Sequence, residues 1–222
     1  MNRRSFLMTP LGAVVVAAAA SGQSGYKAES AGPCTLPDVS DAMKASLQSE
    51  GVRVVDAKGV LCETWLRKII PQKAGSSDSQ YSTVDNGTFA GIINYPARAG
   101  DYRGQILKPG IYTMRFQAMP ADGNHMGCAP STDFVLLAPA GADQDPNAII
   151  GYDELVKMSL KGSGTSHPIP LYLTIPGGAK GATFRSADEH HWAVEFKTKA
   201  QPAGGAEIDF PVAIILVGKS EG

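Results

Sequence analysis

The stretch KPGIYTMRFQAMP, residues 108–120, carries the clearest strand pattern of the chain. It opens on the turn pair Pro109-Gly110 and then alternates apolar side chains with polar or charged ones. Successive side chains of a strand point to opposite faces, so this period of two predicts a strand with one apolar face. The apolar set is Tyr112, Met114 and Phe116, and the opposite set is Thr113, Arg115 and Gln117.

Similar runs lie on both sides of this stretch. Residues 52–70 read as two strands about a Lys58-Gly59 turn, which predicts a hairpin, and Asn86-Gly87 starts a further strand. Pro211 in the last run indicates an edge position or a bulge, because proline cannot donate to a strand ladder. The other strand-like runs cover residues 133–139, 169–176, 191–198 and 207–218.

Two stretches have helical periodicity instead. Residues 37–51 place apolar side chains every four positions, with Asp38 or Ser40 to cap the start and Gly51 to end the helix. Residues 152–162 are expected to form the second helix, with Tyr152, Leu155, Val156 and Ser159 on one face. About nine strands, two short helices and turn-rich connections predict a mainly-β fold, either an antiparallel β-sandwich or a Greek-key barrel.

The N-terminus has the features of a signal peptide. Arg3 and Arg4 precede an apolar run from Leu11 to Ala20, which ends in small residues with an A-x-A pattern. Ten residues make about 15 Å of helix, half of what a bilayer core needs, so this run is too short for a transmembrane anchor. We therefore expect residues 1–20 to be a signal peptide.

The stretch NRRSFL, residues 2–7, resembles a twin-arginine export signal. Asn2 stands where serine or threonine is usual, and Met8 stands where lysine is usual, so the general secretory route is the alternative. Either route predicts a periplasmic or secreted protein. The twin-arginine route carries folded proteins, so it would permit a cofactor without requiring one.

After the signal, residues 21–33 are small and polar and are expected to form a disordered leader, and residues 34–222 are expected to form one β-sandwich-like domain. Loss of Arg3 and Arg4 changes the formal net charge from −1 to −1 − 2, about −3. No basic cluster remains, which argues against nucleic acid and anionic lipid as partners. No later apolar stretch is long enough for a transmembrane anchor.

Three cysteines, Cys34, Cys62 and Cys128, are present. In an oxidising compartment we expect one disulfide and one remaining thiol, and three pairings are possible. A Cys34–Cys62 disulfide is favoured because it would tie the N-terminal helix to the first long strand. Three separate buried thiols are the alternative.

Residues 101–133 contain the elements D-x-R-G-Q, K-P-G-x-Y-T-x-R and D-G-N-H-M-G. With these elements the chain resembles a family of uncharacterised exported bacterial proteins. The hairpin GVRVVDAKGVLCETWLRK, residues 51–68, and GTSHP, residues 164–168, look related to the same family. The resemblance implies export and covers most of the mature chain, but it implies no activity.

The stretch DGNHMGC, residues 122–128, suggests a metal site because it places His125, Met126 and Cys128 together. A blue-copper centre needs a thiolate before the histidine and methionine, but residues 116–117 at that position are phenylalanine and glutamine. Another copper or zinc site, using His125, Cys128 and a further histidine, is possible. The favoured interpretation is a turn, in which the first three residues bend the chain.

His190 and His191 are a weaker metal candidate. Adjacent strand residues point to opposite faces, so both reach one metal only if the strand contains a bulge. The favoured interpretation leaves one histidine solvated and packs the other near Trp192. His167 stands alone before a proline and carries little information.

Residues 143–154, DQDPNAIIGYDE, match part of an EF-hand calcium loop. Ala148 replaces the glycine that makes the sharp turn, and Pro146 stiffens the loop. The alternative is that Asp145 or Asn147 caps the following helix, with acidic residues in its first turn. The candidate calcium ligands are Asp143, Asp145, Asn147 and Glu154.

No catalytic motif is recognisable. G-x-S-x-G is absent, and the one S-x-x-K, residues 24–27, lies in the expected leader. We therefore expect a non-catalytic binding or structural module of the cell envelope that contacts a glycan, an envelope protein or a small ligand. A metal-binding protein or metal-dependent enzyme is the alternative. If His125 lies close to His167, His190 or His191, a metal site is favoured. An exposed aromatic patch that includes Tyr81 or Tyr172 would favour a glycan-binding surface.

Overall fold

The computed structural model describes residues 25–75, 80–102, 104–119, 131–178 and 183–218. One large sheet dominates these residues, in the strand order β1-β2-β3-β5-β8-β9-β10-β13-β12-β11, and β4 pairs with β12 outside this path. The strand pairs are antiparallel, except that β4 runs parallel to β12. The strands β6 (Ala99–Gly100) and β7 (Ile106–Leu107) form a separate small sheet.

The large sheet is built from eleven strands. The first six along the chain are β1 (Lys27–Gly32), β2 (Gly51–Asp56), β3 (Gly59–Leu66), β4 (Ile69–Gln72), β5 (Phe89–Tyr95) and β8 (Gly110–Ala118). The others are β9 (Asp133–Pro139), β10 (Ile169–Thr174), β11 (Thr183–Ser186), β12 (Trp192–Pro202) and β13 (Ile208–Val217).

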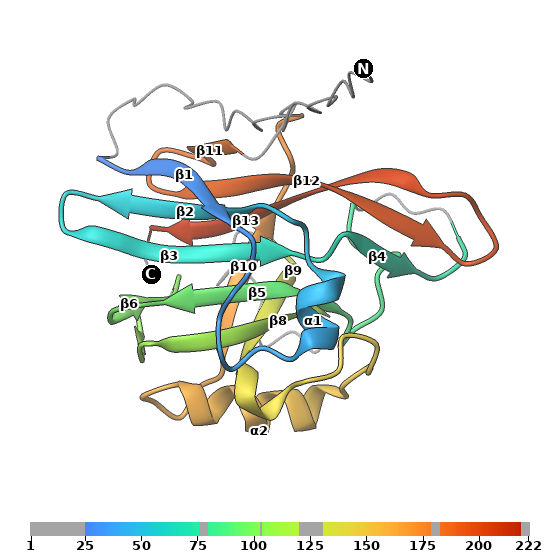
Figure 1. Ribbon diagram of the computed structural model, residues 1–222, viewed down its shortest axis with the longest axis horizontal. Helices are drawn as coiled ribbons and strands as arrows, with labels where there is room; N and C mark the ends of the chain where they lie inside the picture. Colours follow the sequence, from blue (N-terminus) through green and yellow to red (C-terminus); the bar gives the residue numbers. More distant parts are fainter. Residues whose placement is uncertain (1–24, 76–79, 103, 120–130, 179–182, 219–222) are drawn as a thin grey trace, which may run out of the picture.

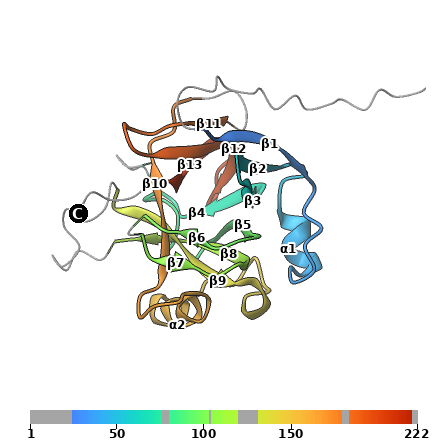
Figure 2. The same ribbon diagram turned by 90° about the vertical axis from the view of Figure 1, so that its left-hand side faces the viewer.

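The sheet curls until its two ends come close together (Figures 1 and 2). β1 and β11, at opposite ends of the strand order, lie side by side, and the ring centroids of Tyr26 and Phe184 are 6.1 Å apart. This curled, mostly antiparallel sheet with two short α-helices confirms the mainly-β fold class. It encloses a layer of side chains from both halves of the strand order.

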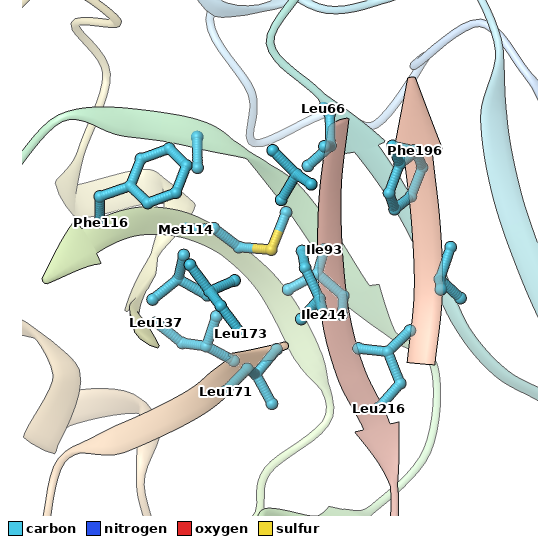
Figure 3. Close-up of a cluster of buried hydrophobic side chains, with 14 of the residues drawn as sticks. Leu66, Ile93, Met114, Phe116, Leu137, Leu171, Leu173, Phe196, Ile214 and Leu216 are labelled. Atoms are coloured by element: carbon cyan, nitrogen blue, oxygen red, sulfur yellow. The ribbon is translucent and has the colours of Figure 1, made fainter. Parts of the chain in front are cut away.

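The interior of the curled sheet is the main core. Tyr112, Met114 and Phe116 of β8 all point into it, as their alternation predicts. Figure 3 shows how β8 contributes Met114 and Phe116 to a cluster shared with distant strands. Each fully buried side chain of this size contributes about 1.5–3 kcal/mol to folding. The cluster also contains Leu66, Ile93, Leu137, Leu171, Leu173, Phe196, Ile214 and Leu216.

Both helices pack on the outside of the sheet. In α1 (Asp41–Ser46), Met43 packs against Trp65 and Phe89, on the face of β3 and β5 that points away from the core. In α2 (Tyr152–Gly162), Leu155 and Met158 pack against the outer face of β9 and β10. The two helices lie at different edges of the molecule (Figure 2).

The predicted turns form where glycine permits them. The β2–β3 hairpin turns at Lys58-Gly59, with Gly59 at φ +122°, and the Asp56 carboxylate accepts from the Lys58 backbone N–H. Gly87 has φ +85°, and a Cβ there would lie 2.2 Å from the Ile150 carbonyl oxygen. Asn86-Gly87 is therefore a turn that also lets a distant loop approach closely.

The structure differs from the sequence expectation in three places. The expected disordered leader contains β1, which pairs with β2 along residues 27–32. The first helix is shorter than expected: Ser40 caps it by accepting from Met43 N–H, and it ends at Ser46 rather than Gly51. The described residues form thirteen strands rather than about nine, because short polar strands such as β1 carry no alternation that a sequence pattern can detect.

Pro211 occupies a local edge within β13. It pairs with Lys197 of β12, whereas β10 pairs only with residues 213–214. This agrees with the edge position that its missing N–H predicts. No helix among the described residues is long and apolar enough to cross a membrane.

Candidate ligand-binding site

A cavity of about 480 Å³ lies between α2 and the outer face of β9 and β10. Its apolar lining comes mainly from the two strands, and its charged lining comes mainly from the helix. Cavities that hold small molecules are usually about 300–1,000 Å³ and largely apolar, with a few polar groups. The lining residues are Met119, Phe134, Leu136, Tyr152, Asp153, Val156, Lys157, His167, Pro168, Pro170 and Tyr172.

The sequence of α2 holds the helix over this cavity. Leu155 and Met158 are buried on the sheet, and the buried Ser159 hydroxyl accepts from the Ile169 backbone N–H at 2.8 Å. Residues four apart lie on one side of a helix, so Asp153 and Lys157 are neighbours at the rim. The cavity therefore has opposite charges on one turn of α2, above an apolar floor.

The expected N-cap of α2 is wrong. Gly151 is its N-cap and makes no side-chain capping bond, so neither Asp145 nor Asn147 caps the helix. The acidic first turn is present as expected, with Asp153 and Glu154 near the positive helix end.

An aromatic chain forms the floor of the cavity and continues beyond it. Phe134 and Tyr172 have ring centroids 6.0 Å apart, Tyr172 and Tyr102 lie edge-on at 5.1 Å, and Tyr102 stacks on His191 at 4.8 Å. Such pairs add about 0.5–1.5 kcal/mol each beyond their buried area. Tyr102 and His191, which do not line the cavity, therefore support the position of Tyr172 in its floor. The role of Tyr102 could not be predicted from the sequence, because no local pattern connects it to Tyr172 or His191.

The side chains of His190 and His191 lie in different environments. His190 is exposed, whereas His191 is only 7% exposed and its Nδ1 lies 2.7 Å from both carboxylate oxygens of Asp188. Burial raises the pKa of Asp188, but hydrogen bonds from the His190 backbone N–H and from His191 outweigh this and leave the pKa below its usual value. His191 thus supports the aromatic chain, as one packed histidine of the pair.

In the loop where calcium was expected, Asp143 binds Arg115. Asp143 is 3% exposed, and its two oxygens accept from Arg115 Nε at 2.8 Å and Nη2 at 2.5 Å. The Asp145 carboxylate accepts from the Asn147 backbone N–H, and Glu154 is exposed on α2. Within the described part of the chain, no group of three or more His, Cys, Asp or Glu could hold a metal ion.

The cysteines do not form the favoured disulfide, because Cys34 and Cys62 are both free thiols. Cys62 faces the main core, whereas Cys34 packs on the α1 side, so the sheet separates them. Burial, with Glu63 nearby, raises the pKa of Cys62 to about 12. Cys128, together with His125 and Met126, lies outside the described residues, so the metal site expected there stays a prediction.

The two tyrosines that would have marked a glycan surface are buried. Tyr81 is 5% exposed and Tyr172 is 2% exposed. The Tyr81 hydroxyl donates to the Thr174 carbonyl at 2.9 Å and accepts from the Ala213 N–H at 3.1 Å. Neither ring therefore offers the open face on which a sugar would stack.

Comparisons with known proteins give no relative: no family model, no curated protein and no solved structure matches this chain.

Proposed function

We propose that this protein is an exported, non-catalytic binding module of the cell envelope, and that the α2 cavity holds its ligand. The observation that carries this proposal is the cavity itself: about 480 Å³, with an apolar floor on β9 and β10 and charged side chains at the rim. Such a combination is typical of small-molecule sites, where apolar contacts give affinity and a few polar groups fix orientation.

The lining suggests the kind of ligand. Phe134, Tyr152 and Val156 would contact an apolar, ring-containing body, and rings pack well edge-on against aromatic side chains. At the rim, Lys157 and His167 would meet a polar or anionic group at one end of that body, and Asp153 would accept from a donor beside it. We therefore infer a small amphipathic ligand rather than a glycan, a conclusion that the burial of Tyr81 and Tyr172 supports.

The export part of the proposal rests on the sequence. The paired Arg3 and Arg4, the short apolar run and its small-residue end favour a signal peptide.

The metal-dependent alternative has two forms. The form that uses His125 and Cys128 lies outside the described residues, and the form that uses the loop from Asp143 to Glu154 is disfavoured by the pairing of Asp143 with Arg115.

The test uses the fluorescent probe 1-anilinonaphthalene-8-sulfonate, which combines an apolar ring system with an anionic group. Titration of the full chain should give saturable fluorescence. Val156→Trp, which fills the cavity from α2, should abolish the signal, whereas Val60→Trp on the distant β2–β3 hairpin should leave it unchanged. Equal binding by the parent and Val156→Trp would overturn the proposal.

A second pair of variants tests the charged rim. Lys157→Glu should weaken binding of the anionic probe, because it removes the cation that lines the cavity. Lys161→Glu lies one turn further along α2, is also exposed and does not line the cavity, so it controls for helix charge. Equal weakening by both variants would show that net charge, rather than the site, attracts the probe.

A further inference from the structure

A second cavity, of about 600 Å³, lies at the end of β8. Its apolar lining includes Tyr81, Val84, Phe116 and Ile149, and Gln117 lines it as well. Met119 lines both this cavity and the α2 cavity, so the two adjoin at that residue. The space is large enough for a small organic molecule.

Gln117 is the unusual member of this lining. It is only 3% exposed, yet neither its side-chain oxygen nor its side-chain nitrogen has a hydrogen-bond partner among the described residues. A buried polar group without a partner costs stability, and such groups are rare in folded proteins. Gln117 lines the cavity with its amide buried, so a ligand would reach the free donor and the free acceptor when the side chain turns toward the space.

Three polar groups in the same lining already have hydrogen-bond partners of their own. The Phe116 carbonyl accepts from the Gly87 N–H at 2.8 Å, and the Asn86 side-chain oxygen accepts from the Ala118 N–H at 2.8 Å. The Tyr81 hydroxyl both donates and accepts, as described above. Since no described residue pairs with the Gln117 amide, a ligand would supply its partners.

Charge at this cavity disfavours an anionic ligand. Lys73 and Asp85 lie 3.5 Å apart in the lining and their opposite charges offset each other, and Asp133 adds a negative charge. A neutral group that presents one acceptor beside one donor is a carboxamide, which can form two parallel hydrogen bonds with a glutamine side chain. The surrounding apolar side chains would contact the rest of the molecule.

We propose that this second cavity binds a neutral small molecule that carries a carboxamide on an apolar body, with Gln117 forming two hydrogen bonds to the carboxamide. This site is separate from the α2 cavity, and the proposal does not depend on the ligand assigned there.

The test compares two probes of nearly equal shape on the full chain. In 3-phenylpropanamide a carboxamide is attached to a phenyl body, and in 4-phenylbutan-2-one a methyl group replaces the amide nitrogen. Calorimetric or NMR titration should give an affinity for the amide at least about tenfold above that for the ketone, as expected for a hydrogen bond to a buried, otherwise unpaired group. Equal affinities would overturn the proposal, and so would absence of amide binding.

Variants locate the effect. Gln117→Met keeps the size of the side chain but removes its hydrogen-bonding atoms, so it should abolish the preference for the amide. Gln201→Met, which changes an exposed glutamine on β12, should preserve it. Val156→Trp should also preserve amide binding, because Val156 lines only the α2 cavity of the two. Loss of amide binding in Val156→Trp would overturn the assignment of the amide site to Gln117. The α2 site is tested separately, by the titration with 1-anilinonaphthalene-8-sulfonate.

A stability measurement checks the premise. If the amide of Gln117 is unpaired in the free protein, Gln117→Met should leave Tm unchanged or raise it, by up to about 2–4 °C. A fall in Tm of that size would show that the amide already has a structural partner, which would overturn the proposal.

Discussion

Arg115 and Gln117 lie two residues apart on the same face of β8, and both are almost fully buried. Arg115 donates all five of its N–H groups, to both carboxylate oxygens of Asp143 and to the carbonyls of Gly87, Asp145 and Ala148. The side-chain amide of Gln117 has no hydrogen-bond partner among the described residues. Equal burial on one strand face thus has two outcomes: the paired group holds the fold together, and the unpaired group is available to a ligand.

The pairing of Arg115 explains why the loop after β9 folds back over β8. The guanidinium connects that loop to the Gly87 turn, and its carbon lies 5.5 Å from the centroid of the Phe89 ring. The Thr113 hydroxyl also donates to Asp143, at 2.6 Å. A second layer of structure therefore covers the polar face of β8.

The largest effect is expected from breaking this pair. Asp143→Ala should lower the free energy of unfolding by about 3–5 kcal/mol, because it leaves a buried guanidinium without its counter-charge. Chemical denaturation of the purified chain measures this. The partly exposed pair Arg53–Glu63 provides the control: Glu63→Gln should cost about 1 kcal/mol or less.

The double variant Arg115→Met/Asp143→Leu refines the same prediction. Replacing both charges with apolar side chains should recover much of the loss, since neither residue is then left with an unpaired charge. A cost below that of Glu63→Gln for Asp143→Ala, or no recovery in the double variant, would contradict the structural role assigned to Arg115.

A smaller effect is expected at an unpaired hydroxyl that lines neither of the two large cavities. Tyr95 is 2% exposed and its hydroxyl has no partner among the described residues, whereas the neighbouring Tyr112 hydroxyl donates to the Lys108 carbonyl at 2.8 Å. Tyr95→Phe should therefore leave the free energy of unfolding unchanged or raise it by about 1 kcal/mol, and Tyr112→Phe should lower it by about 1 kcal/mol. Thermal denaturation of both variants compares them; equal losses would show that the apparent absence of a partner has no energetic consequence.

The sequence predicted β8 and its two faces because alternation is a local property. It did not predict that the polar face would also be buried, since the covering loop lies 28 positions further along the chain at Asp143. The same aspartate matched a calcium pattern for this reason: spacing identifies a residue type but not its partner in space. β1 was missed because its polar residues gain stability only from pairing with β2.

The cavities were less predictable than the strands. The amphipathic pattern of α2 indicated a buried face, and the structure confirms burial of Leu155 and Ser159, whereas Val156 is half-buried and Tyr152 is exposed. The strands under that helix, however, follow only from the order of the sheet. No signal in the sequence distinguishes Gln117 from any other polar strand residue, because the missing partner is defined by the surrounding structure.

A further prediction concerns a paired group near the surface. The pKa of Asp188 is below its usual value, so its contribution to stability is present above the unfolded pKa, about 3.9, and is lost as pH falls through the lower folded pKa. Asp188→Asn should be less stable than the parent near neutral pH, by a small amount because the Asp188 side chain is half exposed. This difference should shrink as the pH falls below about 4.

Denaturation at a series of pH values measures the difference. Glu189→Gln, at a side chain that is 93% exposed, is the control and should show little change at any pH. A stability difference between Asp188→Asn and the parent that grows toward acid pH would contradict the assigned direction.

The smallest expected effect is that of calcium on the Asp143 loop. A calcium ion bound to Asp143 would have to displace Arg115 from both carboxylate oxygens and leave the buried guanidinium without its counter-charge. Binding of a ligand to the folded state raises Tm, so millimolar calcium should leave the Tm of the full chain no higher than the same concentration of magnesium does. A calcium-specific rise that disappears in Glu154→Gln would show instead that the loop rearranges around the ion. Arg115 would then be a group that releases Asp143 rather than one that retains it.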